Sequence, residues 1–322
     1  MKKVSIIIPF KGQTLEELAI PLGSINNQIG VNFDTVDVHL VNDGGESIDT
    51  SAFKIFKNLE INYHELPENV GAGLARQYGM DHSESEYMMF MDSDDSLHFV
   101  GALLEFFNVV KYYGEHQLII ARYLEQFKNG EGEFRYITHP NADWKSPVAK
   151  WFNRAYIEAS GLRFHPDLRI YEDTYFVGLS CELATDIYYL DSVVYSWLYR
   201  EGSTVRSAGR IFEYQTHTWA LENRLYLEVI EQRLPKNLQR DLNNYVTDVY
   251  MRYTVYPPVD EAAFWEEHEK LLARFAYAWQ GYTAELQAQV DALRDAEEGQ
   301  WRGVATEGFK EFVEKGSAHK KQ

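Results

Sequence analysis

Acidic side chains that follow a short apolar segment are the residues of this chain best suited to chemistry. Asp92 and Asp94 come directly after residues 87–91, which carry no charge and are typical of a buried strand. Two carboxylates one residue apart at a strand end can together hold a hard divalent cation through their oxygens. Such a cation can neutralise a diphosphate as it leaves. The same aspartates also fit a helix N-cap, so the pattern alone leaves both interpretations open.

A second acidic pair, Glu172 and Asp173, stands among aromatic residues in the segment 171–176 (YEDTYF). A carboxylate in a partly desolvated cleft has a raised pKa, which suits a general base. The alternative is a helix start, where the helix dipole favours acidic residues. From the residues alone, both interpretations stay open.

Three further segments have the composition of polar loops at a binding site. Residues 42–45 (NDGG) form a turn whose carboxylate or amide can hydrogen-bond a base or a ribose. Residues 69–76 (NVGAGLAR) begin a helix with glycines, so that backbone amides and Arg76 can approach an anion. Residues 199–206 (YREGSTVR) place arginines near hydroxyls, which can close over phosphates. Each segment also fits a plain turn or helix entry, and the phosphate-binding loop GxxxxGK[ST] and the dinucleotide fingerprint GxGxxG are both missing.

The elements that must position these segments alternate along the first hundred residues. Apolar, β-branched runs predict strands at residues 4–8, 36–41, 61–66 and 87–91, and helical spacing predicts helices at 14–28 and 71–80. This order is typical of a parallel sheet, whose ligands bind at the carboxyl ends of the strands. Both aspartate-containing turns lie at such ends. Later strands are expected at residues 118–124 and 187–195, and the chain beyond 211 has helical periodicity.

Composition narrows the class of protein. The 322 residues are 45% hydrophobic and 25% charged, as in ordinary globular proteins. The net charge of −18 disfavours bulk nucleic-acid binding and anionic membranes. The single cysteine, Cys181, excludes an internal disulfide and a cysteine zinc site, and it predicts a reduced, cytoplasmic compartment. The longest apolar stretch, residues 99–110, contains Glu105 and is too short to span a bilayer, so we expect a soluble protein.

Taken together and in order, these segments resemble glycosyltransferase family 2. The matching stretches are VSIIIPF (4–10), SINNQ (24–28), VNDGG (41–45), NVGAGLARQYGM (69–80), MDSDD (91–95), KWFNRAYIEASGLRF (150–164), YEDTYF (171–176) and YREGSTVR (199–206). The resemblance implies an α/β fold of the GT-A type, a Rossmann-like and mainly parallel sheet flanked by helices, over residues 1–210. Residues 1–98 would then bind the nucleotide sugar and residues 99–210 the acceptor. Residues 211–322 would form an all-helical C-terminal extension.

The resemblance also implies roles for individual residues on the donor side. Binding of the nucleoside diphosphate is expected of Pro9, Phe10, Asn42, Asp43, Asn69, Gly71, Arg76 and Asp92. Ser203, Thr204 and Arg206 match a loop near the donor diphosphate. Asp92 and Asp94 match the DxD motif that binds Mn²⁺ or Mg²⁺. A nucleoside-diphosphate sugar is the implied donor.

The implied reaction is an inverting, metal-dependent transfer in the synthesis of a bacterial or phage glycan or glycoconjugate. Asp173 matches the catalytic base, which removes a proton from an acceptor hydroxyl so that this oxygen attacks the anomeric carbon. The partners are therefore the donor and a glycan or glycoconjugate acceptor. The C-terminal helices offer a surface for a homodimer, and the expected location is the cytoplasm, including the inner face of the membrane as a peripheral protein.

Departures from the family pattern bear on the donor base. Asn42-Asp43 stands where an Asp-Asp pair is common, Gly45 where serine is usual, and Lys11-Gly12 replaces a frequent Tyr-Asn. A UDP-sugar is the expected donor, and GDP and dTDP sugars stay open.

Three alternatives remain. A sugar-phosphate nucleotidyltransferase would need a glycine-rich, arginine-containing loop after the first strand, where this chain has residues 9–13 (PFKGQ). A catalytically degenerate sugar-binding or scaffold protein would retain the fold without turnover. A glycosyltransferase acting on a modified DNA base would retain the chemistry with another acceptor.

Overall fold

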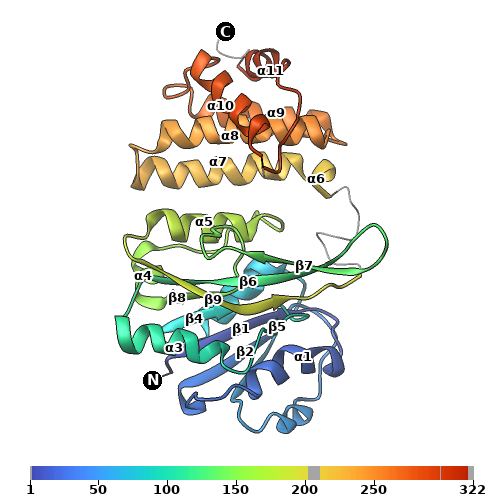
Figure 1. The fold of residues 1–322 in the computed structure, drawn as a ribbon, viewed down its shortest axis with the longest axis vertical. Coiled ribbons are helices and arrows are strands. Elements are labelled where there is room, and N and C mark those ends of the chain that lie inside the picture. The colour runs from blue at the N-terminus through green and yellow to red at the C-terminus, as the bar shows by residue number, and fades with distance from the viewer. Residues whose placement is uncertain (1, 202–210, 298, 318–322) are drawn as a thin grey trace. The chain divides into compact units, whose positions relative to one another are not determined.

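The computed structural model describes residues 2–201, 211–297 and 299–317 (Figure 1). The chain divides into two compact units, Met1–Arg200 and Glu201–Gln322, and each is described by itself. The first unit contains a mixed sheet and its flanking helices, and the second is helical. The predicted α/β fold with a helical extension is confirmed.

The first unit is built on a nine-stranded sheet with the order β3-β2-β1-β4-β8-β6-β9-β5, and β7 pairs with β6. Its parallel part consists of β1 (Val4–Phe10), β2 (Val36–Asn42), β3 (Ile61–Glu65) and β4 (Tyr87–Phe90). Every residue of β1 and β2 is buried. Strands covered on both faces favour nearly continuous apolar runs, which β1 has. Strand β2 also buries Asp37 and His39, whose side chains lie 3.5 Å apart.

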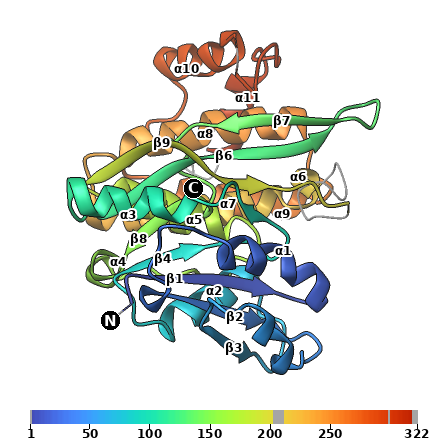
Figure 2. The same ribbon diagram turned by 60° about the horizontal axis from the view of Figure 1, so that its bottom comes forward.

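The remaining strands extend the sheet in mixed directions. They are β5 (Ser96–Leu97), β6 (Leu118–Lys128), β7 (Phe134–His139), β8 (Lys150–Asn153) and β9 (Ile187–Trp197). The short β8 is antiparallel to both β4 and β6, whereas β6 and β9 are parallel. Figure 2 shows β6, β7 and β9 as long neighbouring strands.

Helices cover both faces of this sheet. They are α1 (Leu15–Asn26), α2 (Ala72–Asp81), α3 (Ala102–Tyr113), α4 (Arg154–Ser160) and α5 (Glu172–Leu183), with short 3-10 turns at Phe33–Thr35 and Thr50–Ile55. One face of β1 packs with α1 and α3 in a single apolar core. On the other face, Phe90 of β4 contacts Phe152, Phe164 and Phe176, which brings α5 against the sheet. Helix α1 begins at a capping box, in which Thr14 accepts the Glu17 amide and the Glu17 carboxylate accepts the Thr14 amide.

The second unit consists of helices. They are α6 (Ile211–Tyr214), α7 (Thr216–Arg233), α8 (Leu238–Val255), α9 (Glu261–Arg274), α10 (Ala284–Asp295) and α11 (Phe309–Gly316). An aromatic core joins them, with Tyr250 of α8 and Phe264 of α9 both near Phe312 of α11. In the described part of the chain, no helix combines the length and the apolar character needed to cross a membrane.

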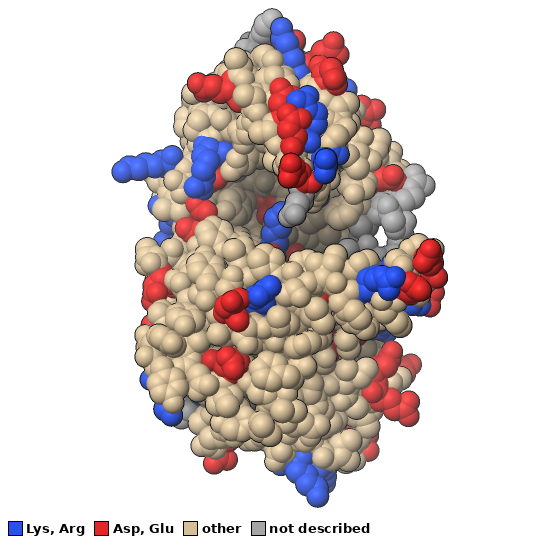
Figure 3. Space-filling model, viewed as in Figure 1, with Lys and Arg blue, Asp and Glu red and all other residues tan. Residues whose placement is uncertain are grey.

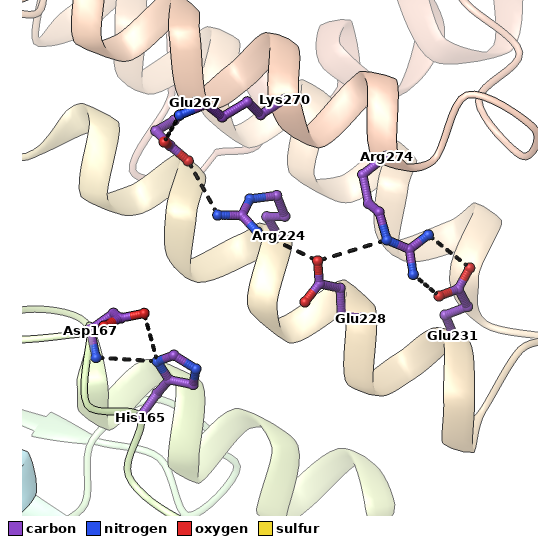
Figure 4. A network of polar contacts seen from close by, with 8 residues as sticks. All are labelled: His165, Asp167, Arg224, Glu228, Glu231, Glu267, Lys270 and Arg274. Atoms are coloured by element: carbon purple, nitrogen blue, oxygen red, sulfur yellow. Dashed lines mark hydrogen bonds and ion pairs between the residues drawn. The ribbon is translucent and has the colours of Figure 1, made fainter.

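Ion pairs link α7 to α9 (Figure 4). Arg224 of α7 lies 3.5 Å from Glu228 and 3.5 Å from Glu267, while Arg274 of α9 reaches back to Glu228 and Glu231. Solvent reaches these pairs, and ion pairs near the surface contribute at most about 1 kcal/mol each, so the apolar core holds these helices together. Charged side chains on the face drawn in Figure 3 are scattered or sit beside opposite charges, without an extended basic patch among the described residues.

Candidate active site

The carboxyl ends of three neighbouring strands bring the first polar loops together. Phe10 ends β1 opposite Asn42, which ends β2, and the Asp43 amide donates to the Phe10 carbonyl at 2.8 Å. Met91 continues β4 with its amide 3.1 Å from the Ile7 carbonyl, so Asp92 emerges at the same edge. The sheet therefore places the two predicted aspartate turns side by side, as its parallel topology requires.

Asn42 uses its side chain to close its own turn. Its Oδ1 accepts the Gly45 amide at 2.8 Å, and its Nδ2 donates to the Glu46 carbonyl at 2.9 Å and to the Tyr63 hydroxyl at 3.1 Å. Phe10 is buried, with its ring 6.3 Å from that of Tyr63. The contact of Asn42 and Phe10 with a nucleoside stays a prediction, and so does that of the buried Pro9. No local pattern in the sequence predicts that Tyr63 contacts this turn.

Asp43 fixes the glycine loop that precedes α2. Its carboxylate accepts the Val70 amide at 2.7 Å and the Gly71 amide at 3.0 Å, and it also accepts from the Asn69 side chain. Gly44 has a φ of +68°, and a Cβ there would lie 2.4 Å from the Asn69 nitrogen. The two loops predicted separately thus form one packed frame. The Asp43 carboxylate is buried in this frame. Its contact with a nucleoside stays a prediction.

Arg76 connects the two acidic motifs. This α2 residue is only 5% exposed, and its Nη2 lies 2.8 Å from Asp92 Oδ1 while its Nη1 lies 3.2 Å from Glu172 Oε1. Burial opposes its charge, but the charges of Asp92, Glu172 and Asp173 raise the pKa of Arg76 further. The guanidinium therefore stays protonated between these carboxylates.

Gly73, one turn before Arg76, allows this approach. A Cβ at Gly73 would lie 2.5 Å from Glu172 Cγ and 3.2 Å from the Phe164 ring. The glycine that suggested an anion-binding loop thus also lets α5 pack against α2.

Glu172 and Asp173 begin α5 directly after Tyr171, whose φ of +65° is unusual for a side chain larger than glycine. Such a conformation costs about 1–3 kcal/mol and is found most often at functional sites. Burial raises the pKa of Glu172 to about 7, helped by the charge of Asp173 and opposed by Arg76. Burial likewise raises the pKa of Asp173, again against Arg76.

The Asp173 carboxylate has one oxygen available. Its Oδ1 accepts the Thr174 amide at 2.7 Å, and Oδ2 receives no hydrogen bond from the described residues. A carboxylate with a raised pKa and an uncommitted oxygen has the properties of a general base. Glu172, by contrast, is held by Arg76.

Tyr195 of β9 shapes the turn that carries Asp92. Its buried hydroxyl accepts the Asp92 amide at 3.0 Å and donates to Asp95 Oδ2 at 2.7 Å. The other Asp95 oxygen accepts the Leu198 amide at 2.8 Å. Asp95 is thus a structural member of the acidic motif. Tyr195 lies about a hundred positions away in sequence, so no local pattern could have identified it.

Asp92 and Asp94 have a donor set that fits a divalent cation. Burial raises the pKa of Asp94, the nearby charge of Asp92 raises it further, and Arg200 lowers it from 3.5 Å away. The closest approach of Arg76 is to Asp92 Oδ1 and that of Arg200 is to Asp94 Oδ2. A hard cation would relieve the repulsion between the two carboxylates and accept further oxygens from a diphosphate. No group of three His, Cys, Asp or Glu residues with metal-site geometry occurs in the described residues, so Mn²⁺ or Mg²⁺ binding stays a prediction.

The predicted site residues therefore fall into two neighbouring groups. Asn42, Asp43, Asn69 and Gly71 form the loop frame, and Arg76 joins Asp92 to the Glu172–Asp173 pair. Ser203, Thr204 and Arg206 lie outside the described residues.

Comparison with known proteins identifies the family. The model of the glycosyl transferase family 2 domain matches residues 5–135, which include the loop frame and the Asp92 turn. The chain is also 30% identical over 191 residues to the poly(ribitol-phosphate) beta-N-acetylglucosaminyltransferase TarP of Staphylococcus aureus strain N315. Residues 5–135 therefore belong to glycosyltransferase family 2. The match to TarP covers 55% of this chain, and the chain spans 56% of the length of TarP.

Solved structures share the fold of nearly the whole chain. The structure of residues 1–349 of S. aureus TarS in complex with UDP-GlcNAc matches with a TM-score of 0.71 and 17% identity. The match covers 99% of this chain and 92% of the TarS chain. The complex of the same TarS fragment with UDP gives a TM-score of 0.68 at 16% identity. At such identities the likeness establishes the fold, including the presence of C-terminal helices after the sheet.

Proposed function

We propose that this glycosyltransferase transfers N-acetylglucosamine from UDP-GlcNAc to a hydroxyl of a polyol-phosphate chain, with inversion at the anomeric carbon. The donor is suggested by TarS, which was solved with UDP-GlcNAc. The acceptor class is suggested by TarP, whose name specifies poly(ribitol phosphate). A UDP-sugar was also the donor expected from the sequence.

The observation that carries this proposal is the position of Arg76 between Asp92 and Glu172. These residues come from α2, from the turn after β4 and from the start of α5, and they are 16 and 96 positions from Arg76. The Arg76 guanidinium holds the carboxylate of Asp92, on the donor side, next to the Glu172–Asp173 pair, which contains the base. The reacting sugar carbon needs both groups nearby, because the nucleophile is activated on one side of this carbon while the diphosphate leaves on the other.

Asp173 acts as the base in this proposal. Its uncommitted Oδ2 takes the proton of the acceptor hydroxyl while that oxygen forms a bond to the anomeric carbon. The bond from this carbon to the UDP oxygen breaks in the same step, so the configuration inverts and UDP leaves. The Asp173 carboxyl then releases the proton to solvent.

Negative charge develops on the departing diphosphate, next to the carboxylates of the site. Mn²⁺ or Mg²⁺ held by Asp92 and Asp94 would supply the neutralising charge. Arg76 and Tyr195 keep Asp92 in place, the first through its carboxylate and the second through its amide. Preorganised groups of this kind lower the barrier because they need not reorient during the reaction.

Transfer to poly(ribitol phosphate) with UDP-GlcNAc and Mn²⁺ tests the proposal. The wild type should attach GlcNAc to the polymer and release UDP in equal amounts. Asp173→Asn should lower kcat by roughly 10²–10⁴-fold, the usual contribution of a general base. UDP affinity should change by less than about twofold, because the lost interaction belongs to the transition state.

Asp191→Asn is the matched control, since Asp191 is an exposed aspartate of β9 paired with Arg122. It should retain wild-type activity. A folded wild type that neither binds UDP nor uses UDP-GlcNAc would contradict the proposal, and so would an Asp173→Asn variant with unchanged kcat.

A further inference from the structure

Arg169 differs from the other arginines of the first unit. Residues 2–201 contain seven arginines, and six of them lie within 4 Å of a carboxylate oxygen. Among the described residues, Arg169 has no such partner, although the chain has a net charge of −18. In so acidic a protein, an exposed guanidinium without a carboxylate partner is available to an anion from outside.

The position of Arg169 is at the edge of the candidate active site. Its Nη1 lies 3.4 Å from the Asn69 side-chain oxygen, and its Nη2 lies 3.3 Å from the Asn69 carbonyl. Its Cγ would be 3.8 Å from a Cβ at Gly71. Arg169 also precedes Glu172 and Asp173 by three and four residues. It therefore lies between the glycine loop and the start of α5.

The contacts of Arg169 are weak for a guanidinium. Both are long and go to neutral oxygens, whereas charge-assisted bonds to carboxylate or phosphate are usually about 2.7–2.9 Å. Asn69 thus orients the side chain without neutralising it. The planar guanidinium of an arginine can donate two parallel hydrogen bonds to two oxygens of one phosphate. A loop without a charged side chain cannot provide this interaction.

We propose that Arg169 binds phosphate oxygens of a substrate and so determines specificity for an anionic ligand. This inference rests on the proposed function, in which the donor diphosphate and the phosphodiesters of the acceptor are the two sources of such oxygens. The carboxylates of Asp92, Glu172 and Asp173 repel both, and Arg169 offsets this repulsion at the edge of the site. A role limited to holding Asn69 would leave the binding of phosphate unchanged.

The test compares Arg169→Gln with Arg163→Gln, because Arg163 is an exposed arginine of the same unit that pairs with Asp81. The KM values for UDP-GlcNAc and for poly(ribitol phosphate) are measured separately, together with UDP affinity by calorimetry. Arg169→Gln should weaken the binding of one of the two substrates about tenfold, and this difference from the wild type should become smaller in high salt. Weaker UDP binding assigns the donor diphosphate, whereas a raised KM for the polymer with unchanged UDP affinity assigns the acceptor. Arg163→Gln should leave all three constants unchanged.

Unchanged constants in Arg169→Gln, in a wild type that transfers GlcNAc, would overturn the inference and leave the proposed function standing. If the wild type transfers nothing, the proposed function fails, and calorimetry with inorganic pyrophosphate and with poly(ribitol phosphate) decides the inference alone. Loss of either binding in Arg169→Gln then supports it. Binding of neither probe by the wild type, or equal binding by both proteins, overturns it.

Discussion

At the scale of single residues, the site holds charges inside the protein that only other charges can compensate. Arg76 is buried between Asp92 and Glu172, and Asp173 contributes to its electrostatic environment. Breaking a buried ion pair by removing one partner is strongly unfavourable, because the remaining charge has lost both water and its partner. Arg76 therefore affects both stability and chemistry.

Replacing this arginine should destabilise the protein. Arg76→Met retains much of the side-chain volume but leaves Asp92 and Glu172 without their shared cation, so the free energy of unfolding should fall by about 3–5 kcal/mol. Urea unfolding measures it. Arg163→Met, which removes an exposed pair with Asp81, should cost no more than about 1 kcal/mol. Equal effects of the two substitutions would show that Arg76 is not the electrostatic centre of the site.

The sequence pattern predicts these residues individually but not the contacts between them. From residues 69–76 we expect Arg76 to approach an anion, and in the structure its guanidinium contacts the carboxylates of Asp92 and Glu172 of this same chain. The partner at position 172 lies on an element whose packing depends on Gly73, so local spacing carries no information about the contact. For the same reason, the use of the Asp43 carboxylate in holding residues 70 and 71 became visible only in the structure.

At the scale of elements, strand β9 supports the acidic turn after β4. Tyr195 accepts the Asp92 amide and donates to Asp95, in the turn that leads from β4 to β5, and β5 itself pairs antiparallel with β9. Asp95 is 1% exposed, and burial raises the pKa of its carboxyl well above the usual range, with the charge of Asp92 adding to the effect. The hydroxyl is therefore a positioning group for the turn.

Tyr195→Phe removes this hydroxyl and leaves the ring. Asp92 loses an acceptor for its amide and Asp95 loses a donor, so the free energy of unfolding should fall by about 1–3 kcal/mol. The KM for UDP-GlcNAc should rise several-fold, since the carboxylates that are proposed to face the donor would be displaced. Tyr189→Phe, on an exposed tyrosine of the same strand, is the control and should change neither quantity. A stability loss with an unchanged KM would restrict Tyr195 to folding.

The elements that the sequence pattern predicts best are those buried on both faces. Strand β1 follows from a nearly continuous apolar run and β2 from a run of valine and leucine interrupted by Asp37 and His39. The predicted helix at residues 14–28 is α1, which ends at Asn26. Strand β7 is largely exposed, so no alternation between apolar and polar residues marked it. The place of β8 between β4 and β6 depends on pairing across more than 30 residues, which periodicity cannot encode.

At the scale of the whole molecule, each unit contains a histidine whose pKa is lowered by burial, the fully buried His268 and the half-buried His64. Burial lowers the pKa of His268 in the helical unit to about 3. In the sheet unit, burial lowers the pKa of His64 to about 4, and the charges of His39 and His82 lower it further. The raised pKa of Glu172, about 7, has the opposite effect on stability. Above the ordinary glutamate pKa of 4.5 the unfolded chain releases a proton that the folded chain keeps, so this contribution to the free energy of unfolding is lost as the pH rises toward neutrality.

The histidines predict acid sensitivity. Below the ordinary histidine pKa of 6.5, the unfolded chain binds protons that the folded chain does not, so stability falls as the pH falls. The fully buried His268 contributes a slope of about 1.4 kcal/mol per pH unit, and solvent screening makes the contribution of the half-buried His64 smaller. His268→Phe should reduce the slope of unfolding free energy between pH 6 and about 4 by this amount. The half-buried His217 of α7 serves as control, and an unchanged slope in His268→Phe would contradict the argument.

The proposed reaction is a single displacement in which Asp173 activates an acceptor hydroxyl opposite a departing diphosphate. The anomeric configuration of the product formed from UDP-α-GlcNAc and poly(ribitol phosphate), determined by NMR for the wild type and Asp173→Asn, decides whether this mechanism holds. We expect a β-linked product from the wild type and, at equal protein concentration, almost none from the variant. An α-linked product, or a β-linked product formed equally fast by Asp173→Asn, would contradict the mechanism.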